Sequence, residues 1–234
     1  MTTRKYFLFI LIAVFGFFAT SGVYADKQEL PEVTVDGLHR VPDSKLAIVY
    51  ATPGADLSRY NRIQLLDAYV AFKKNWLRDQ RSTSISSSRV SSRDVEKIKN
   101  TLSEEFQTVF KDALEEAGYK VTDESGEDVM IVRPAIINLD VSAPDTPTAG
   151  RSRTYTSSAG EMTLYVELYD SITGDIIAKA LDRRADRANA GFYTWSSSVS
   201  NKAAAKRILK GWAKILVNAL NEAKTYGSGG ESDS

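Results

Sequence analysis

Cysteine is absent from the 234 residues of this chain, and histidine occurs once, as His39. Without cysteine the chain has no disulfide bond and no thiolate metal site. His39 precedes the expected domain, so Ser-His-Asp catalysis, Cys-His catalysis and histidine metal sites have no members there. Gly54 and Gly160 stand apart from other glycines, and the sequence has no phosphate loop or dinucleotide fingerprint. We therefore expect no metal and no cofactor.

An excess of charge of one sign is also lacking, because 30 basic residues balance 30 acidic ones. Proteins that bind nucleic acid normally have a strong basic excess or a basic stripe. We therefore expect no nucleic-acid partner.

A hydrophobic run long enough to cross a membrane is missing too. The apolar run Tyr6–Phe18 is shorter than the roughly 20 residues that a bilayer core requires. It follows the basic residues Arg4 and Lys5, and Val23-Tyr24-Ala25 has the small-x-small pattern that a signal peptidase reads. These features favour a signal peptide over residues 1–25, cleaved after Ala25, rather than a retained membrane anchor.

The mature chain would then start at Asp26 and contain no transmembrane segment. Loss of two basic residues leaves 28 against 30 acidic ones, a net charge near −2. No cysteine follows the apolar run, which excludes lipid anchoring through a lipobox. We expect a periplasmic or secreted bacterial protein that is soluble after removal of the signal peptide.

Composition divides the mature chain into three parts. Residues 26–44 are polar and lack periodicity, which predicts a flexible lead. Residues 45–226 contain the periodic segments and predict a single α+β domain. Residues 227–234 are rich in glycine and serine and predict a disordered tail.

Two long amphipathic helices are predicted. In Ser91–Ala117 apolar residues recur at three- and four-residue spacing, Ser91 with Asp94 resembles a capping box, and Gly118 suits the C-cap. The second helix spans about 201–224. Gly211 within it costs about 1 kcal/mol relative to alanine, so we expect a close helix–sheet contact there. The expected inner face of this helix is Ile208, Trp212, Ile215, Ala219 and Ala223.

Strand patterns alternate with these helices. In the longest, Asp128–Val141, apolar positions change parity across Arg133-Pro134, which predicts a β-bulge at that point. Helices of this kind cover one face of a sheet, so the predicted fold is an α+β two-layer sandwich: a mainly antiparallel sheet with two long amphipathic helices on one face. Lys45–Tyr50 is a short apolar segment, and the expected strands are Ile63–Phe72, Tyr119–Val121, Asp128–Val141, Met162–Tyr169 and Ile176–Ala185.

The charged stretch DSITGDIIAKALDRRADR, Asp170–Arg187, suggests either an active site or a hairpin. Asp170 and Ser171 can bond local backbone, and Gly174 can adopt positive φ without steric cost. Beyond the turn, charged residues alternate with apolar ones, as on the solvated face of a strand paired to Glu167. We therefore interpret the stretch as a hairpin. The charged residues of this expected solvated face are Lys179, Asp182, Arg183 and Arg184.

Three segments carry a family resemblance: PGADLSRYNRIQLLDAYVAF, DVMIVRPAIINLDV and ELYDSITGDIIAKALDRRA, with a long helix between the first two. In this order they resemble the bacterial domain of unknown function 3313 family over about 45–224. The resemblance implies an exported, often lipid-anchored envelope protein, although this chain lacks the lipobox cysteine. It implies no activity and no catalytic residue.

Paired carboxylates remain the one catalytic arrangement that the composition allows. Glu161, Glu167, Asp170 and Asp182 could supply the acid and the nucleophile or base of a glycosidase-like hydrolase. Solvated strand faces commonly contain such residues, so we do not expect an enzyme. A periplasmic hydrolase that uses paired carboxylates is the alternative.

Binding to another envelope component, either a protein or a cell-wall component, is the function that we expect. Gly191-Phe192-Tyr193-Thr194-Trp195 contains three aromatic residues between the last strand and the last helix, and Arg151 and Tyr155 lie in the preceding long loop. Aromatic and arginine side chains are common contact residues. These rings could instead hold the final helix against the core. The candidate binding residues are Phe192, Tyr193, Trp195, Arg151 and Tyr155.

Overall fold

The computed structural model describes residues 30–83, 90–141, 155–156, 160–185, 194–195 and 198–228. These residues form an open eight-stranded, mainly antiparallel sheet, a two-stranded sheet and three helices, which confirms the α+β class. Within these ranges no helix combines the length and the apolarity that a membrane span requires. The expected signal peptide and residues 229–234 of the expected tail lie outside them.

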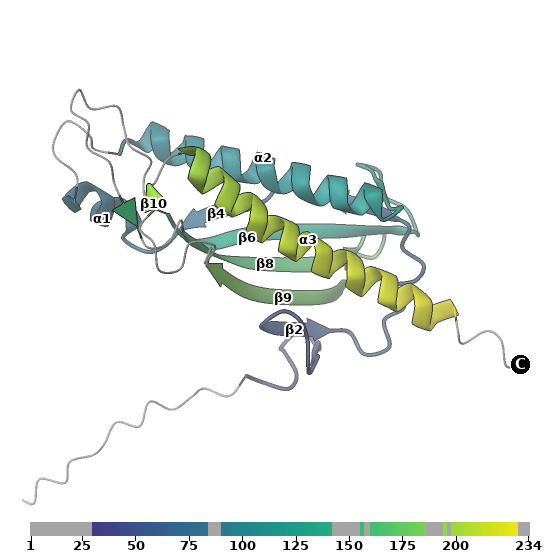
Figure 1. Ribbon diagram of the computed structural model, residues 1–234. Coiled ribbons are helices and arrows are strands. Elements are labelled where there is room, and N and C mark those ends of the chain that lie inside the picture. Colours follow the sequence, from purple (N-terminus) through teal and green to yellow (C-terminus); the bar gives the residue numbers. More distant parts are fainter. Residues whose placement is uncertain are drawn as a thin grey trace, which may run out of the picture. The chain divides into compact units, whose positions relative to one another are not determined.

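The helices are α1 (Trp76–Thr83), α2 (Ser92–Glu116) and α3 (Ser198–Ser228). The strands are β1 (His39–Arg40), β2 (Ile48–Ala51), β3 (Arg62–Leu65), β4 (Tyr69–Phe72), β5 (Lys120–Val121), β6 (Val129–Asp140), β7 (Tyr155–Thr156), β8 (Glu161–Asp170), β9 (Ile176–Ala185) and β10 (Thr194–Trp195). Figure 1 shows α2 and α3 running side by side along the large sheet.

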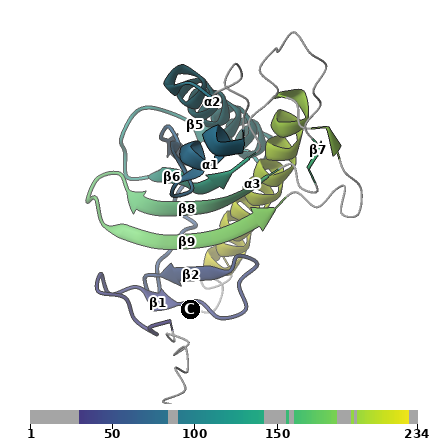
Figure 2. The same cartoon turned by 90° about the vertical axis from the view of Figure 1, so that its left-hand side faces the viewer.

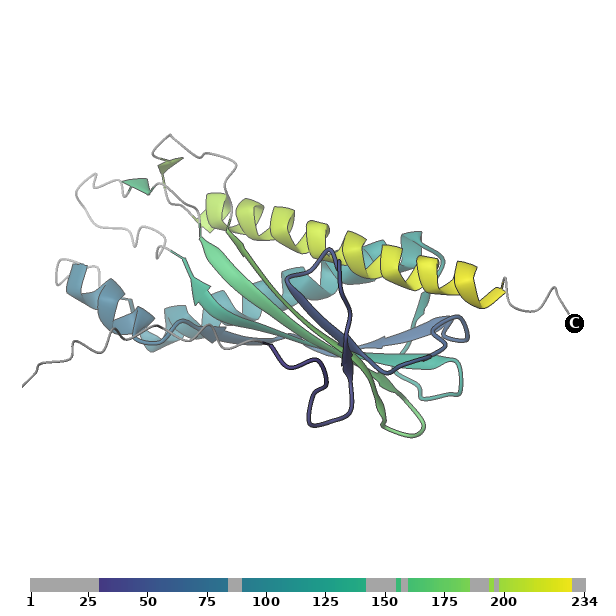
Figure 3. The ribbon, with the colours of Figure 1, turned by 90° about the horizontal axis from the view of Figure 1, so that it is seen from below.

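The large sheet has the strand order β1-β2-β9-β8-β6-β3-β5, with β4 also paired to β6. Figure 2 shows β1, β2, β9, β8 and β6 next to one another in this order. Strands β3 and β4 run parallel to β6 because helices α1 and α2 form the crossover that precedes it. Seen from below, the strands fan out, as the twist of a sheet requires (Figure 3).

The segment 63–72, predicted as one strand, is in fact two. Strands β3 and β4 both pair with β6 but are separated by residues 66–68. Helix α2 bonds the carbonyl groups beside this break: Ser103 Oγ donates to Ala68 O at 3.0 Å, and Gln107 Nε2 donates to Leu65 O at 3.3 Å. The helix therefore supplies hydrogen bonds that a sheet partner would otherwise make.

The bulge in β6 lies four residues after the predicted position. Its pairing with β8 is regular at Pro134 and shifts between Ile137 and Asp140. Asn138 has φ 52° and is exposed, while Leu139 is buried. The parity change that the sequence showed is therefore real, but the prediction of a bulge at Arg133-Pro134 was wrong.

Pro134 fits a regular position because of the break between β3 and β4. Leu66 N donates to Val132 O, so the backbone of Val132 faces the β3–β4 side of β6. Two residues later, the ring nitrogen of Pro134 faces the same side. No strand pairs with β6 at that point, so the missing N–H of proline costs no hydrogen bond of the sheet.

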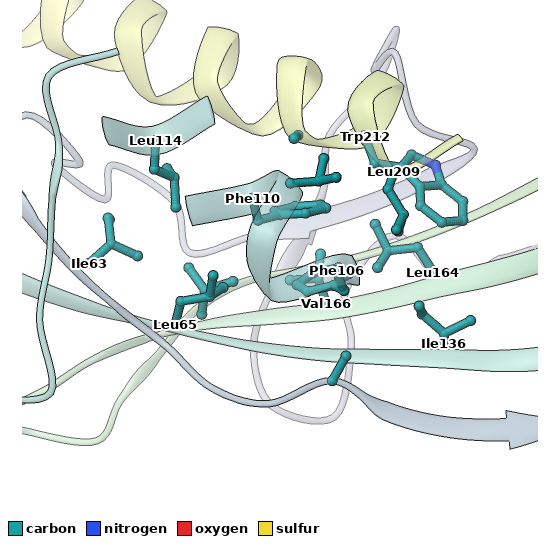
Figure 4. Close-up of a cluster of buried hydrophobic side chains, with 14 of the residues drawn as sticks. Ile63, Leu65, Phe106, Phe110, Leu114, Ile136, Leu164, Val166, Leu209 and Trp212 are labelled. Carbon is teal, nitrogen blue, oxygen red and sulfur yellow. The ribbon is translucent and has the colours of Figure 1, made fainter. Parts of the chain in front are cut away.

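Helix α2 follows the prediction closely. Ser91 and Asp94 form both hydrogen bonds of a capping box, and Gly118 has φ 88° directly after the C-cap residue Ala117. Phe106 and Phe110 are buried and stack with ring centroids 3.9 Å apart. Figure 4 shows both rings between the sheet and α3.

Helix α3 is longer than the predicted 201–224, and its inner face differs in part. Ile208 and Trp212 are buried as expected, and Leu209 and Leu220 are buried as well. Ala219, which was predicted to face the core, is exposed, so the buried face of the second half of the helix differs from the predicted one. The core residues that α2 and α3 share with the strands form one cluster.

Part of the expected flexible lead is ordered. Strand β1 pairs with β2, Leu38 is buried, and the Tyr50 hydroxyl donates to Pro31 O at 2.8 Å. His39, the only histidine of the chain, is exposed. A two-residue strand has too few alternating positions to produce a pattern in the sequence, which is why the prediction missed it.

Candidate functional site

The stretch 170–185 is a hairpin, as predicted: β8 and β9 are antiparallel and Gly174 has φ 73°. Asp170 closes it by accepting from the backbone N–H groups of Ile172 and Thr173, each at 2.8 Å. It also accepts hydrogen bonds from Arg59 and from the Tyr60 hydroxyl. The bond from Thr173, together with those from Tyr60 and Ile172 and the charge of Arg59, outweighs burial and lowers the pKa of Asp170 to about 2.

Glu167 lies on the other side of β8, in a second closed network. Its carboxylate accepts from Tyr165 OH at 2.6 Å, Tyr169 OH at 3.0 Å and Arg133 Nε at 2.7 Å. Burial opposes ionisation, but these hydrogen bonds outweigh it and the pKa of Glu167 is lowered. Burial and Glu167 itself raise the pKa of Tyr165. Glu167 is therefore an ionised hydrogen-bond acceptor with its partners already in place.

Asp182 corrects the interpretation of β9. It was expected on a solvated face, but it is paired in register with Leu164 and buried. It accepts from Trp212 Nε1 at 2.7 Å, from Arg184 Nε at 2.8 Å and from Ala47 N at 3.1 Å. Lys179 is the cross-strand partner of Glu167, as expected, but its ammonium group forms its ion pair with Asp36. Of the four charged residues, Arg183 alone is exposed.

The four candidate catalytic carboxylates are separated by the sheet. Glu161 and Glu167 share one strand but stand six residues apart, about 20 Å at the rise of a strand. Asp182 is the cross-strand partner of Leu164, which lies six residues before Asp170 on β8. Asp170 and Asp182 are therefore also about 20 Å apart, on the face opposite Glu161 and Glu167. A glycosidase pair requires a separation of about 5–9.5 Å. The geometry therefore gives no support to a pair among these four.

Metal ligation finds no support among the described residues either. No group of three or more histidine or acidic side chains in these ranges is placed to hold an ion.

The end of β9 carries two neighbouring arginines, Arg183 and Arg184, whose side chains lie on opposite faces of the sheet. A surface hollow of about 340 Å³ is lined by Arg183, Arg184 and Ala185 at the end of β9 and by Arg207 and Ile208 of α3. We call it the arginine hollow. Arg183 pairs with Glu161 at 2.5 Å, while Arg184 is bound to Asp182 through Nε. Guanidinium groups carry five N–H donors each, so these bonds leave donors for a ligand.

Gly211 of α3 makes room for one of these arginines. A Cβ atom at this position would lie 2.5 Å from Arg184 Nη1, closer than side chains approach one another. The Arg184 guanidinium also lies 5.8 Å from the ring centroid of Trp212. The close helix–sheet contact predicted at Gly211 is therefore present, and its partner from the sheet is Arg184.

The residues predicted to bind a partner are only partly described. Tyr155 of β7 and Trp195 of β10 are Cα partners in the two-stranded sheet. Arg151, Phe192 and Tyr193 lie outside the described residues. The arginine hollow is lined by β9 and α3, and β10 lies between these two elements in the sequence. The predicted aromatic residues Phe192, Tyr193 and Trp195 thus lie in the segment that joins the two elements lining the hollow.

Sequence reasoning missed the arginine hollow. The alternation of charged and apolar residues predicts Arg183 and Arg184 on a solvated strand face, and no pattern in the sequence singles out Arg207. The one signal that pointed there was Gly211, because a glycine inside an amphipathic helix indicated a close contact without naming the partner.

Comparison with known proteins gives one family match. A family model described as "Protein of unknown function (DUF3313)" matches residues 33–216. A search of curated proteins finds no matching sequence.

Solved structures give weaker likenesses. The PelC dodecamer from Paraburkholderia phytofirmans is 12% identical, with 69% of this chain and 96% of that chain covered and a TM-score of 0.32. A candidate lipoprotein from Caulobacter crescentus is 11% identical, with 75% and 95% covered and a TM-score of 0.30. A DUF4136 family protein from Bacteroides thetaiotaomicron is 11% identical, with 77% and 94% covered and a TM-score of 0.30. Likenesses of this size carry no argument about the fold or function of this chain.

Proposed function

We propose that this chain, which belongs to the DUF3313 family, is an exported, non-catalytic protein that binds another component of the bacterial cell envelope. The observation that carries the proposal is the arginine hollow, a surface hollow that is lined by Arg183 and Arg184 of β9 and by Arg207 of α3. Arginine is enriched among the residues that contribute most to binding. The hollow also adjoins, along the chain, the segment that contains the predicted aromatic contacts.

The arrangement of the helices supports a binding surface at this end. We infer that α2 and α3 cover one face of the sheet, because both share a core with Leu164 and Val166 of β8 (Figures 1 and 3). The opposite face of β8 then presents Tyr165 and Glu167, which are already bonded to each other. Arg183 and Arg184 have more N–H donors than their bonds to Glu161 and Asp182 use, whereas the carboxylate of Glu167 already accepts from three side chains.

A periplasmic hydrolase is the second candidate, and no specific observation favours it. Its named carboxylates lie on two faces of the sheet and each has its own partners. A carboxylate pair other than these four would be needed.

Export is tested at the N-terminus of the protein. We expect cleavage after Ala25, so mass spectrometry of the exported protein should find Asp26 as the first residue. An intact Met1, or retention in the membrane through residues 6–18, would contradict export by cleavage.

Binding is tested by cross-linking intact envelopes and purifying the protein with its adducts. We expect one envelope component to be enriched with the native protein and with Arg78→Glu, which changes an exposed arginine on α1. Arg207→Glu in the hollow should lose that component. If no component is enriched with the native protein, the proposed function fails. If Arg207→Glu captures the component as well as Arg78→Glu does, binding lies elsewhere.

A further inference from the structure

The face of the large sheet that points away from the shared core carries two tyrosines in one cross-strand row. Register places Tyr69 of β4 beside Ala135 of β6, and Ala135 beside Tyr165 of β8. The next residues along β4 and β6, Val70 and Ile136, belong to the core, so the row faces the other way. We call Tyr69, Ala135 and Tyr165 the tyrosine row.

The tyrosine row is open to solvent at its β4 end. Tyr69 is 68% exposed, and Ala135 and Tyr165 are half-buried. Two strand spacings, about 10 Å, separate the backbones of the tyrosines. The methyl group of Ala135 between them is too short to cover either ring.

We propose that the tyrosine row binds an uncharged glycan strand, with the two tyrosine rings as its stacking platforms. The C–H groups of a sugar ring carry a small positive charge and pack against the negative face of an aromatic ring. Rings about 10 Å apart can engage sugars along one extended chain. The inference goes beyond the proposed function, because no residue of the row lines the arginine hollow.

Arg133 supplies donors for sugar hydroxyl groups. It lies two residues before Ala135 on the same face of β6, and its side chain is 57% exposed while that of Glu167 is 11% exposed. Its bonds to Glu167 use Nε and one terminal nitrogen. A guanidinium group has five N–H donors, so Arg133 can donate to a sugar without leaving Glu167.

Tyr165 is held in place before a ligand arrives. Its hydroxyl donates to Glu167 at 2.6 Å, two residues along β8 on the same face. This bond fixes the ring at its far end, so less side-chain entropy is lost when a sugar packs on it. A tyrosine hydroxyl that donates once still accepts from a sugar O–H group.

The charges of this face favour an uncharged partner. The basic side chains that β6 and β9 place on it each pair with a carboxylate, so this part of the face has no excess charge to attract a polyanion or a polycation. The three ion pairs are Arg133–Glu167, Lys179–Asp36 and Arg183–Glu161. A glycan without charge disturbs none of them.

The chain's own N-terminal segment is the competing occupant of this face. Figure 3 shows it (purple) in front of the large sheet, where the Tyr50 hydroxyl donates to Pro31 O and Asp36 pairs with Lys179. These contacts reach β2 and β9. Among the described residues, no hydrogen bond or ion pair of residues 31–41 reaches the tyrosine row or Arg133. The row is therefore left to an occupant from outside the chain.

The test is calorimetric titration of the purified exported protein with chitohexaose and with cellohexaose, two uncharged oligosaccharides. We expect saturable binding of at least one of them, and little change as salt is raised because no new charge pair forms. Tyr69→Ala should lower the affinity about tenfold or more, whereas Tyr69→Phe should retain it. The control is Ile172→Ala, which removes an apolar side chain of similar exposure, 60%, from the β8–β9 turn. Thermal melting confirms that each variant is folded.

The inference is overturned if neither oligosaccharide binds, or if Tyr69→Ala binds as tightly as Ile172→Ala. Size-exclusion chromatography with light scattering tests a second copy of this chain as the occupant. A native dimer that becomes a monomer in Tyr69→Ala would show that the row pairs with another copy, and the glycan inference would be wrong. If the oligosaccharides fail while envelope capture still depends on Arg207, the proposed function stands and only this inference fails.

Discussion

At the scale of single residues, Asp170 links the hairpin turn to the chain before β3. Its folded pKa of about 2 lies below the ordinary value of 3.8, so its ionised form is stabilised by folding. That contribution is complete above pH 3.8 and is lost as the pH falls toward 2. We predict that Asp170→Asn lowers the free energy of unfolding by about 1–2 kcal/mol at pH 7, and by less at pH 2.5. Urea unfolding at both pH values measures this, and an equal loss at both would contradict it.

Phe106 is one of the largest buried side chains of α2. It is fully buried, stacks on Phe110 and belongs to the core shared by both helices and the sheet. We predict that Phe106→Ala lowers the free energy of unfolding by about 3–5 kcal/mol, as for other buried aromatic residues. Lys111→Ala, an exposed change on the same helix, should cost less than about 0.5 kcal/mol. A loss under about 1 kcal/mol for Phe106→Ala would be inconsistent with this core.

At the scale of elements, α3 contains Gly211 at a position where alanine would ordinarily stabilise a helix. Gly211→Ala in a free helix should stabilise by about 1 kcal/mol. Here the new Cβ would meet Arg184 Nη1 at 2.5 Å, so the guanidinium must move and the gain should be smaller. We predict that the full gain returns when Gly211→Ala is made in an Arg184→Ala background. Thermal melts of the four proteins measure the coupling, and additive effects would show that the two residues do not touch.

The β8–β9 hairpin depends on the left-handed residue in its turn. Gly174 has φ 73° and no atom near the position of a Cβ, so a substitution there meets backbone strain and no clash. We predict that Gly174→Val lowers the free energy of unfolding by about 1–2 kcal/mol or more. Gly174→Asn should cost less, because asparagine tolerates this conformation. Equal losses for valine and asparagine would mean that the strain is not what matters at this turn.

Local patterns explain which elements the sequence predicted well. The capping box of α2 and the limits of β9 depend on neighbours a few residues away, and both were found. The break at 66–68 and the bulge at Asn138 depend on β6, β8 and α2, which are distant in sequence. A parity change shows that a strand is irregular, but the partner strand decides at which residue.

At the scale of the whole molecule, the sequence predicted the α+β class and the family, and the structure and the family match confirm both. Strand order was beyond prediction because three parallel pairings arise from a crossover through α1 and α2. The arginine hollow was beyond prediction because its lining comes from two elements, β9 and α3, that only the fold brings together. Arg184 and Arg207 are 23 positions apart in sequence and meet only when α3 packs along β9.

The central claim is that the β9–α3 end contacts an envelope component, and photo-crosslinking in living cells tests it most directly. A photoreactive residue at Lys210, next to the hollow on an exposed face of α3, leaves all three arginines in place. A second chain carries the same residue at Lys111, on the exposed face of α2. The account predicts a discrete adduct from position 210 that is absent from position 111. No adduct from position 210, or the same adduct from both positions, would contradict it.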